Sequence, residues 1–145
     1  MEDALRAFEQ VAALAGHSLR PGELEVQFLA APHQPPTALP SGRMAVYCFG
    51  FGDEWLKIGK AGPKSGPRFT SHHYNTSAPS TLAKSLIADS RMGSVADFRP
   101  ERAGDWIRQR THRVNLLLPS RRDGTLLALL EAFLHARFKP RYEGH

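Results

Sequence analysis

The sequence predicts an α+β protein with a small, mainly antiparallel three-stranded sheet flanked by helices and preceded by an N-terminal helical appendage. Two segments rich in β-branched and aromatic residues follow each other closely near the middle of the chain, and a third lies beyond residue 110. Helical periodicity is clearest near the two ends. The resulting order of strand, strand, helix, strand, helix indicates an α+β domain.

The first 42 residues are predicted to form the appendage. From Ala4 to Ala15 apolar residues recur at nearly the 3.6-residue period of an amphipathic helix, which Gly16 would end. A short strand is expected at residues 25–29. Residues 31–42 are rich in proline and are predicted to form a linker or a wrapped arm. The main domain is therefore expected to span residues 43–145, the length of one small domain.

The main domain is predicted to open with a hairpin. Residues 44–51 form an apolar strand that ends in the turn Gly52-Asp53, and Leu56 and Ile58 alternate with polar neighbours in the next segment, 55–60. The following Gly- and Pro-rich stretch leads to Pro67, which suits the first position of a helix.

The second half of the domain is expected to contain one more strand and a long helix. Residues 83–89 fit either a helix or a buried strand, and residues 91–104 a loop before a short helix at 106–109. The third strand is predicted at 112–119, and the strongest helix at 126–138, ended by Pro140.

Composition favours an anionic partner and an intracellular protein. The formal net charge is +5, which raises the prior for nucleic acid without specifying it. One cysteine, Cys48, cannot form an intramolecular disulfide, as expected in a reducing compartment. The acidic N-terminus does not resemble a signal peptide, and no apolar run approaches the roughly 18 residues of a membrane span. We therefore expect a cytoplasmic protein.

Four side chains of the main domain have the chemistry of phosphodiester hydrolysis. Tyr47 projects from the first strand, Arg68 offers a planar fork of donors for phosphate, and His72 follows it at helical spacing. Glu131 interrupts an otherwise apolar helix, where a carboxylate is seldom buried unless it is paired or binds a metal. Taken one at a time, each also fits an ordinary role, as a core aromatic or as a surface charge.

Their order resembles that of the GIY-YIG nuclease superfamily over residues 44–143. Residues 45–47 match the first motif, Lys57-Ile58-Gly59 the second, Arg68 and His72 the following helix, and Glu131 the metal-binding glutamate. Lysine replaces the usual tyrosine of the second motif, as in a subgroup common in phages and bacteria, and the late asparagine of the family is not evident.

The resemblance implies a metal-dependent endonuclease that hydrolyses DNA in a phage, mobile-element or defence context. Its catalytic residues would be Tyr47, Lys57, Arg68, His72 and Glu131, with Mg²⁺ or Mn²⁺ held by Glu131. Tyr47 would orient or deprotonate the attacking water, and deprotonation requires a pKa below the ordinary value of about 10.

DNA contacts are expected around this site from five polar residues, which are Lys60, Tyr74, Asn75, Ser80 and Lys84. The same stretch also fits a loop held by its own side-chain turns. Two alternatives stay open: a nucleic-acid-binding module that kept the fold without catalysis, and a subunit that binds a partner through the N-terminal helix. A double-strand cut by so small a module would require a homodimer or two binding events.

Overall fold

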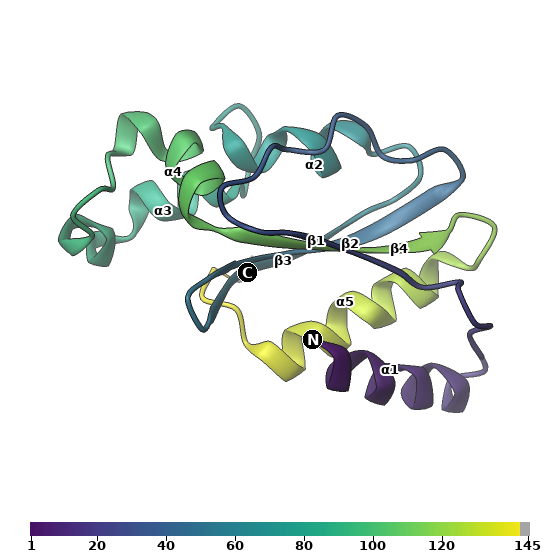
Figure 1. Ribbon diagram of the computed structural model, residues 1–145. Coiled ribbons are helices and arrows are strands. Elements are labelled where there is room, and N and C mark those ends of the chain that lie inside the picture. Colours follow the sequence, from purple (N-terminus) through teal and green to yellow (C-terminus); the bar gives the residue numbers. More distant parts are fainter. Residues whose placement is uncertain (143–145) are drawn as a thin grey trace.

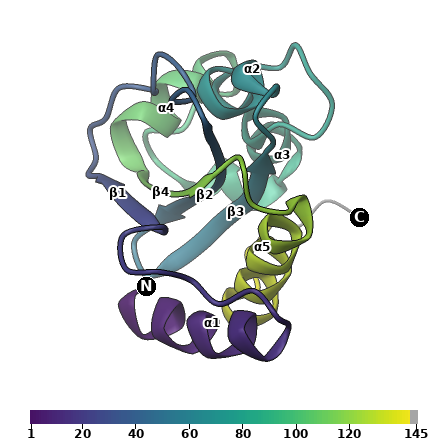
Figure 2. The same cartoon turned by 90° about the vertical axis from the view of Figure 1, so that its right-hand side faces the viewer.

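A four-stranded antiparallel sheet lies between two layers of helices in the computed structural model, which describes residues 1–142 (Figures 1 and 2). The strand order is β1-β4-β2-β3, so β1 and β3 form the edges. The strands are β1 (Glu25–Leu29), β2 (Arg43–Phe51), β3 (Glu54–Ala61) and β4 (His112–Pro119).

The prediction of three strands is wrong by one, because the segment at residues 25–29 joins the sheet. β1 pairs with β4 along its whole length, from Glu25 opposite Leu117 to Leu29 opposite Arg113. β4 is a central strand and offers hydrogen-bonding groups on both sides, so a short segment that carries little signal alone is held there by its neighbour.

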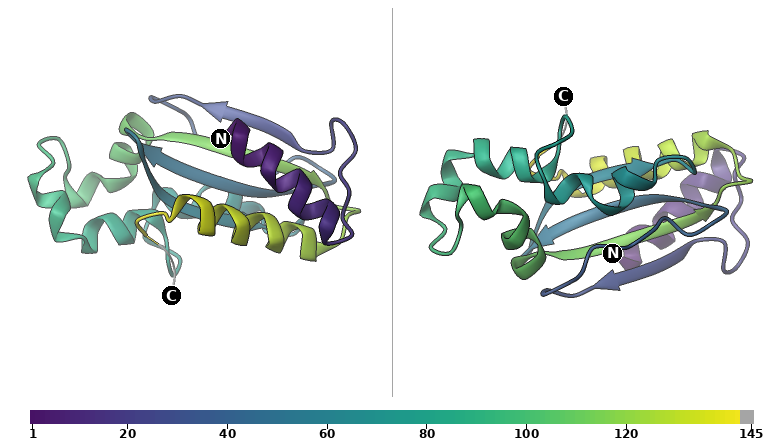
Figure 3. Two further views of the ribbon diagram at one scale, coloured as in Figure 1. Left: turned by 90° about the horizontal axis from the view of Figure 1, so that it is seen from below. Right: turned by 90° about the horizontal axis from the view of Figure 1, so that it is seen from above.

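Helices α1 (Glu2–Leu14) and α5 (Gly124–Phe138) cover one face of the sheet (Figure 3). Phe8 of α1 is fully buried, and its ring centroid lies 5.7 Å from that of Phe133 on α5. Both helices share one apolar core with the alternate strand residues Val46, Cys48 and Leu116. Residues 1–42 thus supply a helix of this layer as well as an edge strand.

The opposite face carries the shorter helices and the arm between β1 and β2, which runs beside α2 (Figure 1). The helices are α2 (Gly66–Thr70), α3 (Leu82–Ala88), α4 (Ala103–Arg110) and the 3₁₀ turns η1 (His72–Tyr74), η2 (Ser90–Ser94) and η3 (Pro100–Arg102). The segment at 83–89 is therefore helical, and the expected loop at 91–104 contains two 3₁₀ turns.

After α5 the chain returns to the edge of β3. The backbone N–H groups of Arg141 and Tyr142 donate to the carbonyls of Trp55 and Leu56 at 2.9 and 2.8 Å. The Tyr142 hydroxyl donates to Asp89 at 2.6 Å, which ties this edge to the α3 layer. Among residues 1–142, no helix has the length and apolar character needed to cross a membrane.

Candidate active site

Tyr47 lies on the face of β2 that carries α2, directly opposite Gly59 of β3. The Tyr47 side chain is fully buried and its ring crosses over Gly59. A Cβ atom at position 59 would lie 2.7 Å from the phenolic oxygen, closer than real Cβ contacts allow. The glycine of the Lys-Ile-Gly sequence therefore makes room for the tyrosine.

The phenolic oxygen of Tyr47 accepts two hydrogen bonds. Arg68 donates from Nε at 3.2 Å, and His73 contacts the same oxygen through Nε2 at 2.7 Å. The backbone N–H of Leu82 donates to Nδ1 of His73 at 3.1 Å. Because Nδ1 is thus an acceptor, the neutral ring carries its proton on Nε2 and donates it to Tyr47. The hydroxyl hydrogen of Tyr47 is then left for a third partner.

Both rings are uncharged at neutral pH. Burial raises the pKa of Tyr47, and the opposing effects of the Arg68 and Arg113 cations do not cancel it. Burial, with the nearby charge of Lys57 next, lowers the pKa of His73 to about 3. Proton abstraction by Tyr47 would require a lowered pKa, whereas in the free protein the pKa of Tyr47 is raised.

The sequence predicts His72 as the catalytic histidine, but the histidine that contacts Tyr47 is His73. Helix α2 ends at Thr70 and the chain continues as the 3₁₀ turn η1, so the helical spacing expected between Arg68 and His72 does not hold. His73 is buried, and within the described chain the His72 side chain makes no hydrogen bond or ion pair. The adjacent pair of histidines gave no means of choosing between them.

Glu131 on α5 pairs with Lys60 of β3. The Glu131 side chain is 17% exposed and that of Lys60 is 43% exposed, so the pair borders on solvent. Lys60 points toward the α5 face and Tyr47 toward the α2 face, so the two parts of the candidate site lie on opposite faces of the sheet. The negative charge of Glu131 nevertheless acts on Tyr47, because it contributes to the raised pKa of the phenol.

A divalent ion at Glu131 would have few protein ligands. Among the described residues, no group of three or more His, Cys, Asp or Glu side chains is placed to hold a metal. Glu131 supplies one carboxylate, and His135, one turn later, contacts the carbonyl of Ile58 at 3.0 Å. Mg²⁺ commonly takes one or two carboxylates, with water and substrate phosphate as its other ligands, so the donor set is compatible with it.

Lys57, the lysine of the second motif, is buried. Its ammonium group donates to the carbonyl of Tyr142 at 3.3 Å. Lys57 lies on the same face of β3 as Gly59, and it contributes positive charge close to His73. The position of Lys57 therefore suits an electrostatic role beside Tyr47 and His73.

Arg113 is a buried cation that the sequence analysis missed. It donates to the side-chain oxygen of Asn115 at 2.7 Å, the carbonyl of Phe69 at 2.5 Å and the hydroxyl of Tyr74 at 3.1 Å. Its guanidinium carbon lies 5.4 Å from the ring centroid of Tyr47, and it pairs with no carboxylate of the described chain. The signal was an arginine at an inward position of an apolar strand, alternating with Asn115.

The predicted DNA contacts differ in how accessible they are. Tyr74 is buried, and its hydroxyl lies 2.8 Å from Nε2 of His33. The Asn75 side chain accepts from the backbone N–H of Ser77 at 3.0 Å, as in an Asx turn. Ser80, at a φ of 55°, and Lys84 on α3 are exposed. Of these four residues, Lys84 is the cation free to meet a phosphate.

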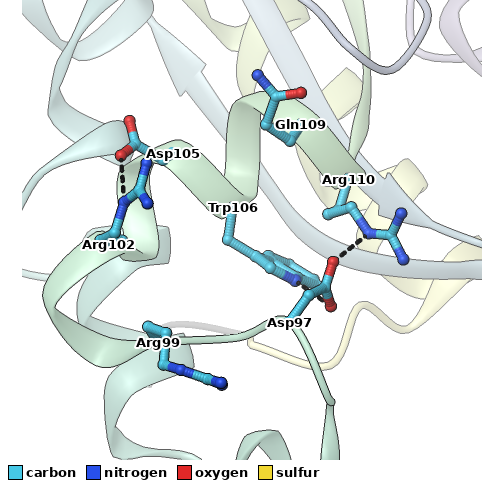
Figure 4. Close-up of a pocket in the computed structure, with 7 residues that line it drawn as sticks. All are labelled: Asp97, Arg99, Arg102, Asp105, Trp106, Gln109 and Arg110. Carbon is cyan, nitrogen blue, oxygen red and sulfur yellow. Dashed lines mark hydrogen bonds and ion pairs between the residues drawn. The ribbon is translucent and has the colours of Figure 1, made fainter.

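A separate hollow of about 200 Å³ lies beside α4 and contains none of these residues (Figure 4). Asp97 accepts from Nε1 of Trp106 at 3.3 Å and pairs with Arg110 at 2.7 Å, while Asp105 pairs with Arg102 at 3.1 Å. Two of the three arginines that line it are thus paired with its two aspartates, and we assign the hollow no function. In comparisons with protein-family models, curated proteins and solved structures, no match to the chain was found.

Proposed function

We propose that the protein is a metal-dependent endonuclease of GIY-YIG type that hydrolyses DNA phosphodiester bonds. The observation that supports this best is the Tyr47 hydroxyl, which receives hydrogen bonds from Arg68 and His73, while the charge of Glu131 also acts on this phenol. The pKa of this phenol is shifted by burial and by specific charged neighbours, and such groups are candidates for functional sites.

Tyr47 would orient the attacking water rather than deprotonate it in the free enzyme. Its oxygen accepts from two donors, so its own hydrogen is left for a third partner, which would be a water or a phosphate oxygen of the bound substrate. A water held by a fixed phenol pays its orientation cost before the reaction begins.

Arg68 would bind the phosphate and link it to Tyr47. Its Nε is engaged by the phenol, whereas its two terminal nitrogen atoms make no hydrogen bond within residues 1–142. Those nitrogen atoms present the planar donor pair that suits phosphate oxygens, and they would neutralise charge that develops in the transition state.

Glu131 would hold the divalent ion, which when bound supplies neutralising charge at the phosphate. Lys60 keeps the Glu131 carboxylate in place before substrate arrives, and its exposed ammonium group can turn toward a phosphate once released. Mg²⁺ or Mn²⁺ is the ion we propose.

The pairing of Glu131 with Lys60 also favours a second candidate, a nucleic-acid-binding module without catalysis. An ammonium group already satisfies the carboxylate, and the pKa of Tyr47 is raised by burial rather than lowered. Such a module would bind DNA through its basic surface and leave it intact.

A cleavage assay separates the two. Supercoiled and single-stranded DNA are incubated with Mg²⁺ or Mn²⁺ and wild-type protein, Glu131→Gln, or the exposed control Glu9→Gln. We expect nicking by the wild type and the control, and a loss of about a hundredfold or more in Glu131→Gln. Binding without cleavage in either metal would establish the second candidate, and equal cleavage by Glu131→Gln would show that the site is wrongly assigned.

A further inference from the structure

The Pro-rich arm forms the roof of an open hollow of about 450 Å³ between β1, β4 and α2. This volume lies within the range of small-molecule sites in proteins. Polar lining groups come from Gln27, Gln34, Thr37 and Asn115, and apolar ones include Pro36 and Phe69. We name it the arm pocket.

The arm pocket has no charged lining residue, although the protein carries a net charge of +5. A phosphate or a metal ion would find no counter-charge inside it. Side-chain amides beside apolar surface instead match a neutral, planar group with hydrogen-bonding edges. Gln and Asn amides pair in this way with the edges of nucleobases.

The arm is fixed at both ends over the pocket. His33 lies 2.9 Å from the carbonyl of Thr111 through Nδ1 and 2.8 Å from the Tyr74 hydroxyl through Nε2. Its backbone N–H donates to the carbonyl of Arg108. At the other end the Pro40 carbonyl accepts from the backbone N–H of Arg43. The roof is thus part of the folded domain and pre-forms the cavity.

The pocket floor is in register with the candidate active site. Gln27 is opposite Asn115, Asn115 is opposite Tyr47, and Tyr47 is opposite Gly59, so the four form one row across the sheet. Neighbouring strands lie about 4.8 Å apart, which puts the strand of Gln27 roughly 10 Å from that of Tyr47. Phe69, which lines the pocket, directly follows Arg68.

The amides of the pocket are oriented and partly free. Asn115 is fully buried, and Arg113 engages its oxygen at 2.7 Å, so its NH₂ group faces Gln27 across a long 3.4 Å contact. The exposed Gln34 side chain makes no hydrogen bond within the described chain. Asn115 therefore offers donors at a fixed position, and Gln34 offers both a donor and an acceptor on a side chain that can turn.

From these observations we infer that the arm pocket binds a nucleobase. The base belongs to an unpaired nucleotide that is adjacent to the phosphate held at Arg68. The inference rests on the proposed DNA substrate. The charged site receives the phosphate and the uncharged pocket receives a neighbouring base, so one nucleotide strand satisfies both. Base contacts of this kind specify sequence, whereas phosphate contacts position the strand.

The test uses the four deoxynucleoside 5′-monophosphates as probes and 2-deoxyribose 5-phosphate as the control without a base. Side-chain amide signals of the full chain are followed by NMR. We expect saturable shifts of the Gln34 and Asn115 signals with at least one nucleotide and none with the sugar phosphate. Gln34→Ala should weaken binding about tenfold, the value of one good amide–base pair. The matched control Gln109→Ala, on α4 outside the pocket, should bind as the wild type does.

A second variant tests whether the effect of Gln34→Ala on binding is indirect. Ala38→Trp, in the exposed roof, should fill the pocket and abolish the nucleotide-dependent shift of Asn115 while the far-ultraviolet spectrum is unchanged. The inference is overturned if the sugar phosphate shifts the same signals, or if no nucleotide does at its solubility limit. Nucleotide binding without DNA cleavage would refute the nuclease proposal and support the arm pocket. DNA cleavage without nucleotide binding would support the nuclease and refute the arm pocket.

Discussion

Gly59 shows how one missing side chain shapes the candidate site. The ring of Tyr47 occupies the space of a Cβ atom at this position, with three ring and hydroxyl atoms within 2.7 to 2.9 Å. We expect Gly59→Ala to lower the free energy of unfolding by about 1–3 kcal/mol through overpacking and to displace the phenol from Arg68 and His73. Urea unfolding measures the first effect and DNA cleavage the second.

The matched control for that substitution is Gly66→Ala. Gly66 begins α2, and a Cβ there would meet no atom within 4 Å, so the change should leave the stability unchanged or raise it by less than about 1 kcal/mol. If Gly59→Ala behaved like this control in both measurements, the close approach of the Tyr47 ring would be wrong.

His73 predicts a distinct pH dependence of stability. Its pKa falls to about 3 on folding because the ring is buried, against 6.5 in the unfolded chain. Below pH 6.5 the unfolded chain therefore binds a proton that the folded chain does not, so stability falls as the pH falls. Between about pH 6.5 and pH 5 this one group should remove about 2 kcal/mol from the free energy of unfolding.

Urea unfolding at a series of pH values tests the assignment. His73→Gln should flatten the acid limb of the stability curve by that amount, whereas His72→Gln should keep the wild-type slope. Lowered pKa values of His33 and His112, which are also partly buried, add to the slope in all three proteins and cancel in the comparison. Equal slopes for the two variants would refute a buried neutral His73.

Sequence patterns placed Tyr47 on a strand and Glu131 on the late helix, because both follow from local periodicity. The choice between His72 and His73 depended on where a five-residue helix stops, and the exact end of a helix is the part that local patterns define least well. Arg113 was missed because the burial of this cation depends on partners in η1 and α2 that lie 39 and 44 residues away in the chain.

At the scale of elements, the residues after α5 protect the open edge of β3. Two backbone hydrogen bonds cover part of this edge, and Arg141 adds a two-nitrogen contact to Glu54. The Arg141 side chain is 21% exposed, so this contact is better shielded than an ordinary surface pair. An edge strand left bare would invite pairing with another chain.

We expect Arg141→Ala to lower the free energy of unfolding by about 1–2 kcal/mol, between the values of a surface ion pair and of a partly buried charged hydrogen bond. Arg137→Ala is the matched control, since Arg137 is exposed and its side chain makes no hydrogen bond or ion pair within residues 1–142. Chemical denaturation of both variants provides the measurement. A loss of equal size in the control would assign the effect to net charge instead of the Glu54 contact.

The long elements were predictable and the short ones were not. The β2–β3 hairpin, β4 and α5 follow from apolar patterns many residues long. Segment 83–89 is too short for periodicity to decide, and Thr81, whose side chain caps α3 by accepting from the Lys84 N–H, is the local signal that favours the helix. β1 exists because β4 offers it a partner, which no property of residues 25–29 alone reveals.

At the scale of the whole molecule, residues 1–42 are integrated into both layers. α1 buries Ala4, Phe8 and Ala12 in the core shared with α5. β1 completes the sheet beside β4, and His33 links the arm to Thr111 and Tyr74 on the other face. The sequence analysis treated this part as an appendage because its proline-rich arm interrupts regular structure, and a break in local pattern does not imply a break in packing.

These contacts predict that residues 43–145 do not fold alone. Without α1 and β1 the fragment would expose the apolar face of α5 and leave β4 with an unpaired edge, and a small domain has little stability to lose. Circular dichroism during urea titration should show a cooperative transition for the full chain and none for the fragment. In the full chain, Phe8→Ala should cost about 3–5 kcal/mol, whereas Leu14→Ala, 90% exposed on the same helix, should cost almost nothing. A fragment with a cooperative transition of its own would make residues 1–42 a separable appendage, and the arm pocket, which they largely build, a property of the full chain alone.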